Sequence, residues 1–218
     1  FLVAAYGALL GIDGHYWFST GDEGWTPPGS ANGWLASQGK WVMATPETLG
    51  TFPAAAWAYR MGYLDEGAPV LTERRALADL WQRRTPLIAE SPSFDPNRDA
   101  GDLAPASNLK TALPAEAFLL GPVRVQHGAD PARSEALPLS GIVNGQIRAH
   151  GGQVVLDPAR GFAIVDAPRV QGVAAHFAKA PLHKLSTLSF ESGNAYGAAL
   201  AVSLDGEPLA RSRRVLVQ

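Results

Sequence analysis

The C-terminal part of the sequence is a series of short apolar runs separated by turn residues, and this pattern limits the fold more than any other feature. From Ser140 onward, β-type runs alternate with turn pairs such as Gly151-Gly152 and Asp205-Gly206. Short, evenly spaced strands of this kind are typical of an antiparallel sandwich or barrel. The expected strands lie within residues 141–148, 153–157, 161–166, 170–177, 185–191, 198–204 and 213–217. We therefore expect an antiparallel β domain here.

The N-terminal residues have a helical character instead. Residues 1–10 are apolar and rich in Ala and Leu, and Gly11 is a typical helix stop. Aromatic residues within 14–20, bounded by glycines, favour a short buried strand. A second helix is expected from about residue 51 to 62, because Pro53 is tolerated only in a first turn. Helix, turn and buried strand together predict an α/β unit.

The remaining segments are predicted to be mainly connections. Residues 21–40 are dense in Gly, Pro, Ser, Asp and Trp without periodicity, and a loop of this length in a compact domain is usually functional. Residues 69–72 indicate a strand, and residues 73–84 have Leu and Trp at helical spacing. Residues 85–138 hold many prolines and short apolar runs. The expected divisions are residues 1–66, a Pro-rich connecting region with short elements at 67–139, and the β domain at 140–218.

Composition excludes several functions. The formal charge of -2 provides no field that would hold a polyanion, so no nucleic-acid partner is expected. Without Cys there are no disulfides, thiolate metal sites or Cys nucleophiles, although this does not identify the compartment. The histidines lack metal-ligand spacing, the serines lack a G-x-S-x-G turn, and the glycines match no phosphate-binding loop. We expect no metal and no cofactor.

The ends of the chain look like cuts in a longer protein. The first apolar run has no basic region or cleavage site, and it stops at Asp13, short of the ~20 residues that a membrane span needs. We predict neither a signal peptide nor a membrane partner. The chain starts inside an expected helix and stops at Gln218 inside a strand pattern. Localisation stays open, and a secreted or periplasmic parent protein is compatible with these observations.

Several stretches resemble bacterial glycoside hydrolases of the kind found among clan A β-galactosidases and cellulases. Residues 11–18, 44–46 and 52–62 resemble the end of the barrel in those enzymes. Residues 144–148, 166–172 and 202–212 resemble the β domain that follows it. The resemblance implies an α+β fold, in which the last strand and helices of a (β/α)8 barrel precede an antiparallel β-sandwich-like domain. It also implies an oligosaccharide or polysaccharide as partner.

The same resemblance implies that the catalytic carboxylates lie upstream. Clan A enzymes take them from the ends of the fourth and seventh barrel strands, which would precede Phe1. A retaining glycosidase needs two carboxyl groups about 5 Å apart across the sugar. A partial barrel also leaves its sheet unclosed. Self-association, or a further chain segment that completes the barrel, is therefore expected.

Four residues are candidates for sugar contact. The resemblance implies that the indole of Trp17 forms the floor of a sugar subsite, and the alternative is a core Trp. Trp25 and Trp34 lie in the Gly- and Pro-rich loop, where an indole either caps the fold or stacks on a ligand. His15 would orient a hydroxyl or carboxylate, or else serve a structural role.

Asp22 and Glu23 are the candidate catalytic carboxylates within this chain. Adjacent carboxylates can raise one another's pKa, which acid catalysis uses. The alternative is a solvated loop pair, since chain neighbours rarely face one substrate. Three functions follow: a glycoside hydrolase segment with its carboxylates upstream, a non-catalytic carbohydrate-binding or structural β module, or an independent enzyme that uses Asp22 or Glu23.

Overall fold

The structure, a computed structural model, describes residues 1–16, 49–82 and 114–218. The chain divides into two compact units. Unit 1 contains Phe1–Ala68 and Ser140–Gln218, and unit 2 contains Pro69–Leu139. The N-terminal helices and the C-terminal strands therefore share one unit.

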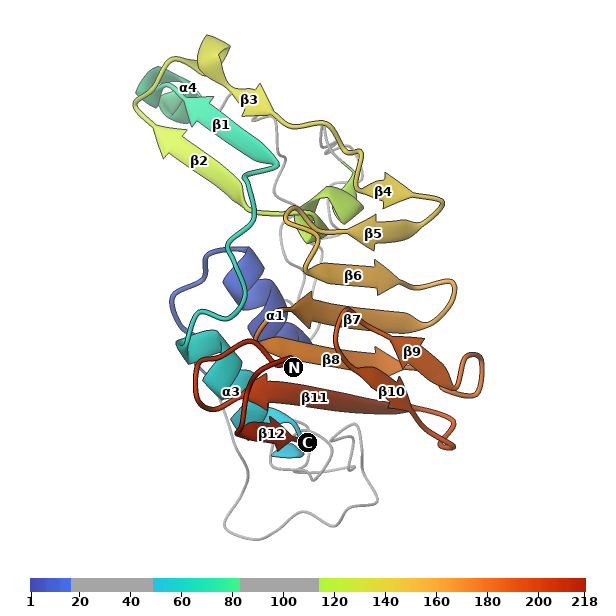
Figure 1. The fold of residues 1–218 in the computed structure, drawn as a ribbon. Helices are drawn as coiled ribbons and strands as arrows, with labels where there is room; N and C mark the ends of the chain where they lie inside the picture. Colours follow the sequence, from blue (N-terminus) through green and yellow to red (C-terminus); the bar gives the residue numbers. More distant parts are fainter. Residues whose placement is uncertain (17–48, 83–113) are drawn as a thin grey trace, which may run out of the picture. The chain divides into compact units, whose positions relative to one another are not determined.

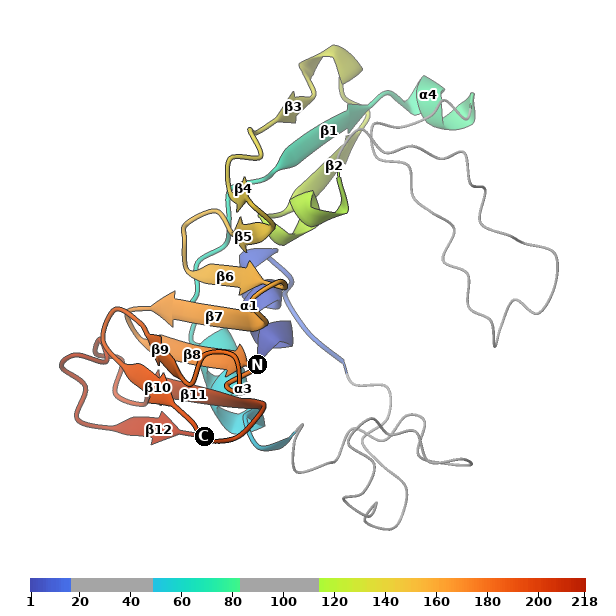
Figure 2. The same ribbon diagram turned by 90° about the vertical axis from the view of Figure 1, so that its right-hand side faces the viewer.

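Unit 1 is built on an antiparallel sheet, here called the large sheet. Among the described residues its strand order is β12-β11-β8-β7-β6-β5-β4, and every neighbouring pair is antiparallel (Figure 1). Figure 2 shows the strands following one another in this order. Their bounds are Ile142–Val143 (β4), Gln146–Arg148 (β5), Val154–Asp157 (β6), Phe162–Ala167 (β7), Val170–Ala175 (β8), Gly197–Ser203 (β11) and Val215–Val217 (β12).

The central strands of the large sheet are covered on both faces. Every residue of β8 is buried, whereas the edge strands β4 and β12 are short and largely exposed. Successive side chains point to opposite faces of a strand, so a wholly buried strand requires two covering layers. Helices form one layer and a β-hairpin forms the other.

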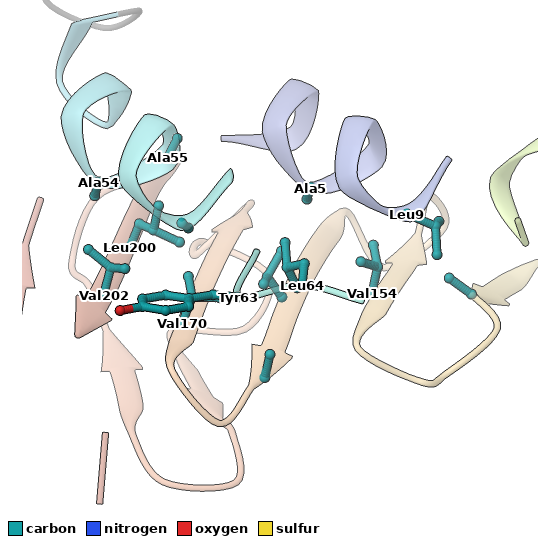
Figure 3. Close-up of a cluster of buried hydrophobic side chains, with 14 residues drawn as sticks. Ala5, Leu9, Ala54, Ala55, Tyr63, Leu64, Val154, Val170, Leu200 and Val202 are labelled. Carbon is teal, nitrogen blue, oxygen red and sulfur yellow. The ribbon is translucent and has the colours of Figure 1, made fainter. Parts of the chain in front are cut away.

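The helical layer consists of α1 (Leu2–Leu9) and α3 (Phe52–Arg60). Both helices confirm the sequence prediction, including a proline in the first turn of α3 and the glycine stop at Gly62, whose φ is +61°. Figure 3 shows the contact between this layer and the sheet, in which Leu200 and Val170 lie beneath small residues of the helices. Burying such a Leu or Val side chain stabilises the fold by roughly 1.5–3 kcal/mol.

Two hydrogen bonds fix α3 to the C-terminal strands. The indole Nε1 of Trp57 donates to the carbonyl of Ser203 at 3.0 Å, and the amide of Ala54 donates to Oε1 of Gln218 at 2.8 Å. Ala54 is fully buried, and its small side chain lets the helix lie close to β11. These bonds connect positions more than a hundred residues apart in sequence, which explains why N- and C-terminal segments form one unit.

The opposite layer is a hairpin of β9 (Leu182–Lys184) and β10 (Ser189–Glu191), here called the hairpin. Its core partners on the large sheet include Phe162 and Val173. The turn of the hairpin is tied to buried Gln171 on β8, whose Oε1 accepts from the amide of Leu188 at 2.9 Å. Gln171 also donates to Asp166 Oδ1 at 2.7 Å, so its amide group is bonded at both ends.

Unit 2 has a small sheet of its own. Strand β1 (Leu71–Arg75) pairs in parallel with β2 (Val123–His127) and antiparallel with β3 (Glu135–Ala136). The other described elements are α4 (Leu77–Trp81) and the 3-10 helices η2 (Ala115–Leu119) and η3 (Pro131–Arg133). An ion pair joins Arg75 Nη2 to Glu73 Oε2 at 2.9 Å.

The predicted fold class, α+β with the end of a (β/α)8 barrel, is wrong. The described residues are mostly β, in largely antiparallel sheets with three short α-helices, and α1 and α3 pack on antiparallel strands from residues 154–202. Residues 14–16 of the expected barrel strand have no regular structure, and residues 17–20 lie outside the described part. An apolar helix and an Ala-rich helix can pack on any sheet, and their partner strands are set by long-range contacts that no local pattern reveals.

Several strand boundaries also differ from the prediction. The run 141–148 is two strands joined by a turn at Asn144 and Gly145, where φ is 51° and 79°. Residues 73–75 belong to β1, which confines the expected helix of 73–84 to α4 within the described residues. The sequence patterns do not predict β2, β3 and β9. The first two pair with β1, which is distant in sequence, and β9 has only three residues.

Candidate functional site

The sequence-predicted site residues are mostly outside the described structure. Residues 17–48 are not described, so Trp17, Trp25, Trp34, Asp22 and Glu23 have no structural placement. The predicted roles of these residues therefore stay predictions. Any account of a site must rest on other residues.

His15 is described, and it packs against the helical layer. Its ring lies 5.4 Å from the ring of Tyr59 on α3, at an interplanar angle of 52°. The hydroxyl of Tyr59 donates to the carbonyl of Ile12, which closes the chain after α1 onto α3. A Cβ at Gly7 would collide with the His15 imidazole. These contacts fit the structural alternative for His15.

A different group of residues gathers at one end of the large sheet, where three connections meet. These are the turn between β6 and β7, the link after β8, and the link from β10 to β11 (Figure 1). The amide of His176 donates to the carbonyl of Gly161 at 2.9 Å, and the amide of Ala178 donates to the carbonyl of Ala195 at 3.2 Å. Backbone hydrogen bonds thus hold the three connections side by side.

An exposed aromatic pair occupies this end of the sheet. The rings of Tyr196 and His176 lie 5.2 Å apart at 58°, and 62% of Tyr196 is exposed. Gly161 leaves room for the imidazole, because a Cβ there would come within 2.9 Å of His176 Cδ2. Continuing the strand register past β7, β8 and β11 places Gly161, His176 and Tyr196 in one cross-strand row. We call Tyr196 and His176 the ring pair.

The turn beside the ring pair is held rigidly and carries positive charge. Asp157 is buried, its Oδ1 accepts from the amide of Arg160 at 2.9 Å, and its Oδ2 accepts from Gln146 Nε2 at 3.1 Å. The ammonium of Lys179 reaches the carbonyl of Ala159 at 3.5 Å. The site therefore combines an exposed aromatic face with donors on a fixed frame.

The carboxylates of unit 1 mainly have structural partners. Asp166 Oδ2 accepts from the amide of Ser186 at 3.0 Å, and Asp65 Oδ2 accepts from Gln153 Nε2 at 2.8 Å. Each therefore holds a neighbouring segment in place. Hydrogen bonds donated to a carboxylate favour its charged form.

Asp205 is the most strongly perturbed carboxylate of the described residues. The backbone N–H of Arg213 holds the pKa of Asp205 well below its usual range, with further help from the hydroxyls of Ser212 and Ser203. The Ser203 hydroxyl lies 2.9 Å from Asp205 Oδ1. No histidine takes part in the described bonds of this cluster, so it closes the loop between β11 and β12 and does not form a Ser-His-Asp arrangement.

In the described ranges, no three His, Asp or Glu side chains are arranged to hold a metal ion. Within the same residues, no helix has both the length and the apolar character needed to cross a membrane. No family model, curated protein or solved structure matches this chain. The properties of the site therefore rest on its own geometry.

Sequence reasoning missed the ring pair. The histidines, His176 among them, lack metal-ligand spacing, and no sequence motif singles out Tyr196. The available signal was the position of Tyr196, directly between the Ser192-Gly193-Asn194 turn and the strand that follows. An aromatic residue at the rim of a sheet, next to a Gly-containing turn, has little core to join and is a candidate for ligand contact.

Proposed function

We propose that this chain is the non-catalytic carbohydrate-binding β part of a carbohydrate-active protein, with the ring pair as its sugar contact. The observation that carries the proposal is the exposed Tyr196 ring, set beside His176 on a frame of backbone hydrogen bonds. An aromatic face covers the C–H patch of a sugar and leaves the hydroxyls free. The imidazole and tyrosine hydroxyl would bond to those hydroxyls.

Two other exposed aromatic residues of the described ranges show no such ring pairing. Trp81 on α4 is 87% exposed and Tyr16 is 99% exposed, yet no described ring contact orients either one. Single exposed apolar residues are common on protein surfaces and need no explanation. A ring that is held by a second ring loses less conformational entropy when a ligand binds, which favours Tyr196 as the contact.

The proposal is tested by titrating the chain with cello-, xylo- and galacto-oligosaccharides and measuring heat of binding. We expect Tyr196→Ala to weaken binding roughly two- to tenfold, the range that one aromatic contact contributes. Trp81→Ala is the matched control, because it removes a more exposed aromatic residue from the other unit. Absence of binding by the unmodified chain, or equal affinity of the two variants, would contradict the proposal.

A second assay on the same chain distinguishes glycoside hydrolysis from sugar binding alone. A chain that contributes binding surface alone will not cleave aryl glycosides. Cleavage that is lost in Glu23→Gln and kept in Asp205→Asn would favour the independent enzyme instead. The hydrolase-segment hypothesis predicts activity only after residues upstream of Phe1 supply the two carboxylates.

A further inference from the structure

His183, in the middle of β9, is a buried histidine with one unbonded ring nitrogen. It is 8% exposed, and in the described part of the chain no group bonds to its buried Nε2. Buried polar groups are normally hydrogen-bonded, so an unbonded ring nitrogen calls for an explanation. Neither the ring pair nor the proposed sugar contact uses this side chain.

Two phenylalanines hold the His183 ring. The ring centroids of Phe162 on β7 and Phe177 after β8 each lie 5.5 Å from it, with interplanar angles of 63° and 82°. From the hairpin itself, Phe190 is the cross-strand partner of His183. The imidazole therefore lies among three aromatic side chains between the hairpin and the large sheet.

Two carboxylates face the hairpin from the large sheet, and both have other partners. Asp157 on β6 accepts from the amide of Arg160 and from Gln146, and Asp166 on β7 accepts from Gln171 and from the amide of Ser186. Arg160 stacks over Phe162 at 5.1 Å from the ring centroid and acts on His183 as a like charge. Lys184 follows on the same strand, and Lys179 lies in the link after β8. Glu191 on β10 is next to Phe190, so strand alternation turns it to the other face of the hairpin.

Burial lowers the pKa of His183, and the charge of Arg160 lowers it further, while a hydrogen bond with the backbone of Ala180 acts in the opposite direction. When the hairpin is detached from the large sheet (undocked), the His183 ring is in water and has the ordinary histidine pKa of about 6.5. The docked hairpin therefore binds fewer protons than the undocked hairpin. The stabilisation of docking by neutral His183 is fully present above about pH 6.5. This stability falls as the pH drops from about 6.5 to the docked pKa and then levels off.

We propose that the hairpin is an acid-sensitive flap, docked on the large sheet while His183 is neutral and loosened when His183 takes up a proton. The turn of the hairpin has ties that do not involve His183, namely the bonds of Ser186 to Asp166 and of Leu188 to Gln171. The flap therefore loosens at β9 and β10 while its turn stays attached. This inference does not depend on the proposed sugar contact.

Amide hydrogen exchange of the full chain at pH 7.5 and pH 5.0 tests the flap. After correction for the intrinsic pH effect, we expect the β9 and β10 amides to lose protection by up to roughly tenfold per pH unit below 6.5. The β7 and β8 amides should keep theirs. Equal protection at both pH values, or a uniform loss across the large sheet, would overturn the proposal.

Two variants separate His183 from other titrating groups. His183→Phe keeps an aromatic ring and cannot be protonated, so its hairpin should stay protected at both pH values. Arg160→Gln removes the like charge and so raises the pKa of the docked His183 toward the undocked value, which should make the loss of protection between pH 7.5 and pH 5.0 smaller. Arg160 is exposed, so this second variant remains informative even where His183→Phe folds poorly. A loss of protection in Arg160→Gln that equals or exceeds that of the unmodified chain would contradict the assignment to His183.

Discussion

Gly172 on β8 shows how one residue can set the packing of the central sheet. Its Cα lies so close to β11 that an added Cβ would overlap the side chain of Leu200 and come within 2.9 Å of the carbonyl of Ala199. Its φ is not in the left-handed region, so the requirement is for space and not for backbone freedom. The glycine lets Leu200 fill the layer beneath the helices.

We predict that Gly172→Ala destabilises the protein by about 1–3 kcal/mol, the usual cost of overpacking a close-packed core. Gly193→Ala is the control, because no atom lies within 4 Å of the Cβ that it adds. That control should be neutral or stabilising by up to about 1 kcal/mol. Urea unfolding followed by circular dichroism measures the stability of both variants. Equal unfolding midpoints would contradict the prediction, because they would mean that β11 accommodates the added methyl group without loss of stability.

At the scale of elements, the hairpin depends on one buried polar residue as well as on His183. Gln171 is fully buried and bonds to Asp166 and to the amide of Leu188. Its amide group also donates to the hydroxyl of Ser186. The turn of the hairpin is therefore anchored by charge-assisted and amide hydrogen bonds inside an otherwise apolar interface.

Gln171→Ala should leave the amide of Leu188 and one oxygen of Asp166 without this partner, at a cost of about 1–3 kcal/mol. We expect limited proteolysis to cut the turn at 185–188 faster in this variant. Ser189→Ala, on the exposed side of β10, should be cut at the unmodified rate. A Gln171→Ala protein with unchanged proteolysis would mean that the apolar contacts of the hairpin suffice alone.

Helices α1 and α3 and most strands of the large sheet could be predicted from sequence, because their signals are local. Gly11 and Gly62 mark helix ends, and turn pairs such as Gly151-Gly152 separate strands. The barrel prediction failed because helices give no information about which strands they cover. The ring pair was missed for a related reason, since Gly161, His176 and Tyr196 become neighbours only through strand register.

At the scale of the whole molecule, unit 1 joins segments from both ends of the chain, while unit 2 comes from the residues between them. The long-range bonds of Trp57 and Ala54 to the C-terminal strands make the helical layer part of the β core. The large sheet is therefore a rigid support for the loops at its end. This support gives the ring pair a fixed geometry, which is what a binding surface needs.

Chemical-shift mapping of the isotope-labelled chain during titration with cello-, xylo- and galacto-oligosaccharides is the most direct test of the proposed sugar contact. We predict saturable shifts concentrated at the amides of Gly161, His176 and Tyr196, and little change at Trp81 in the other unit. Shifts confined to the indole N–H signals of Trp17, Trp25 and Trp34, or no shifts with any of these sugars, would contradict it.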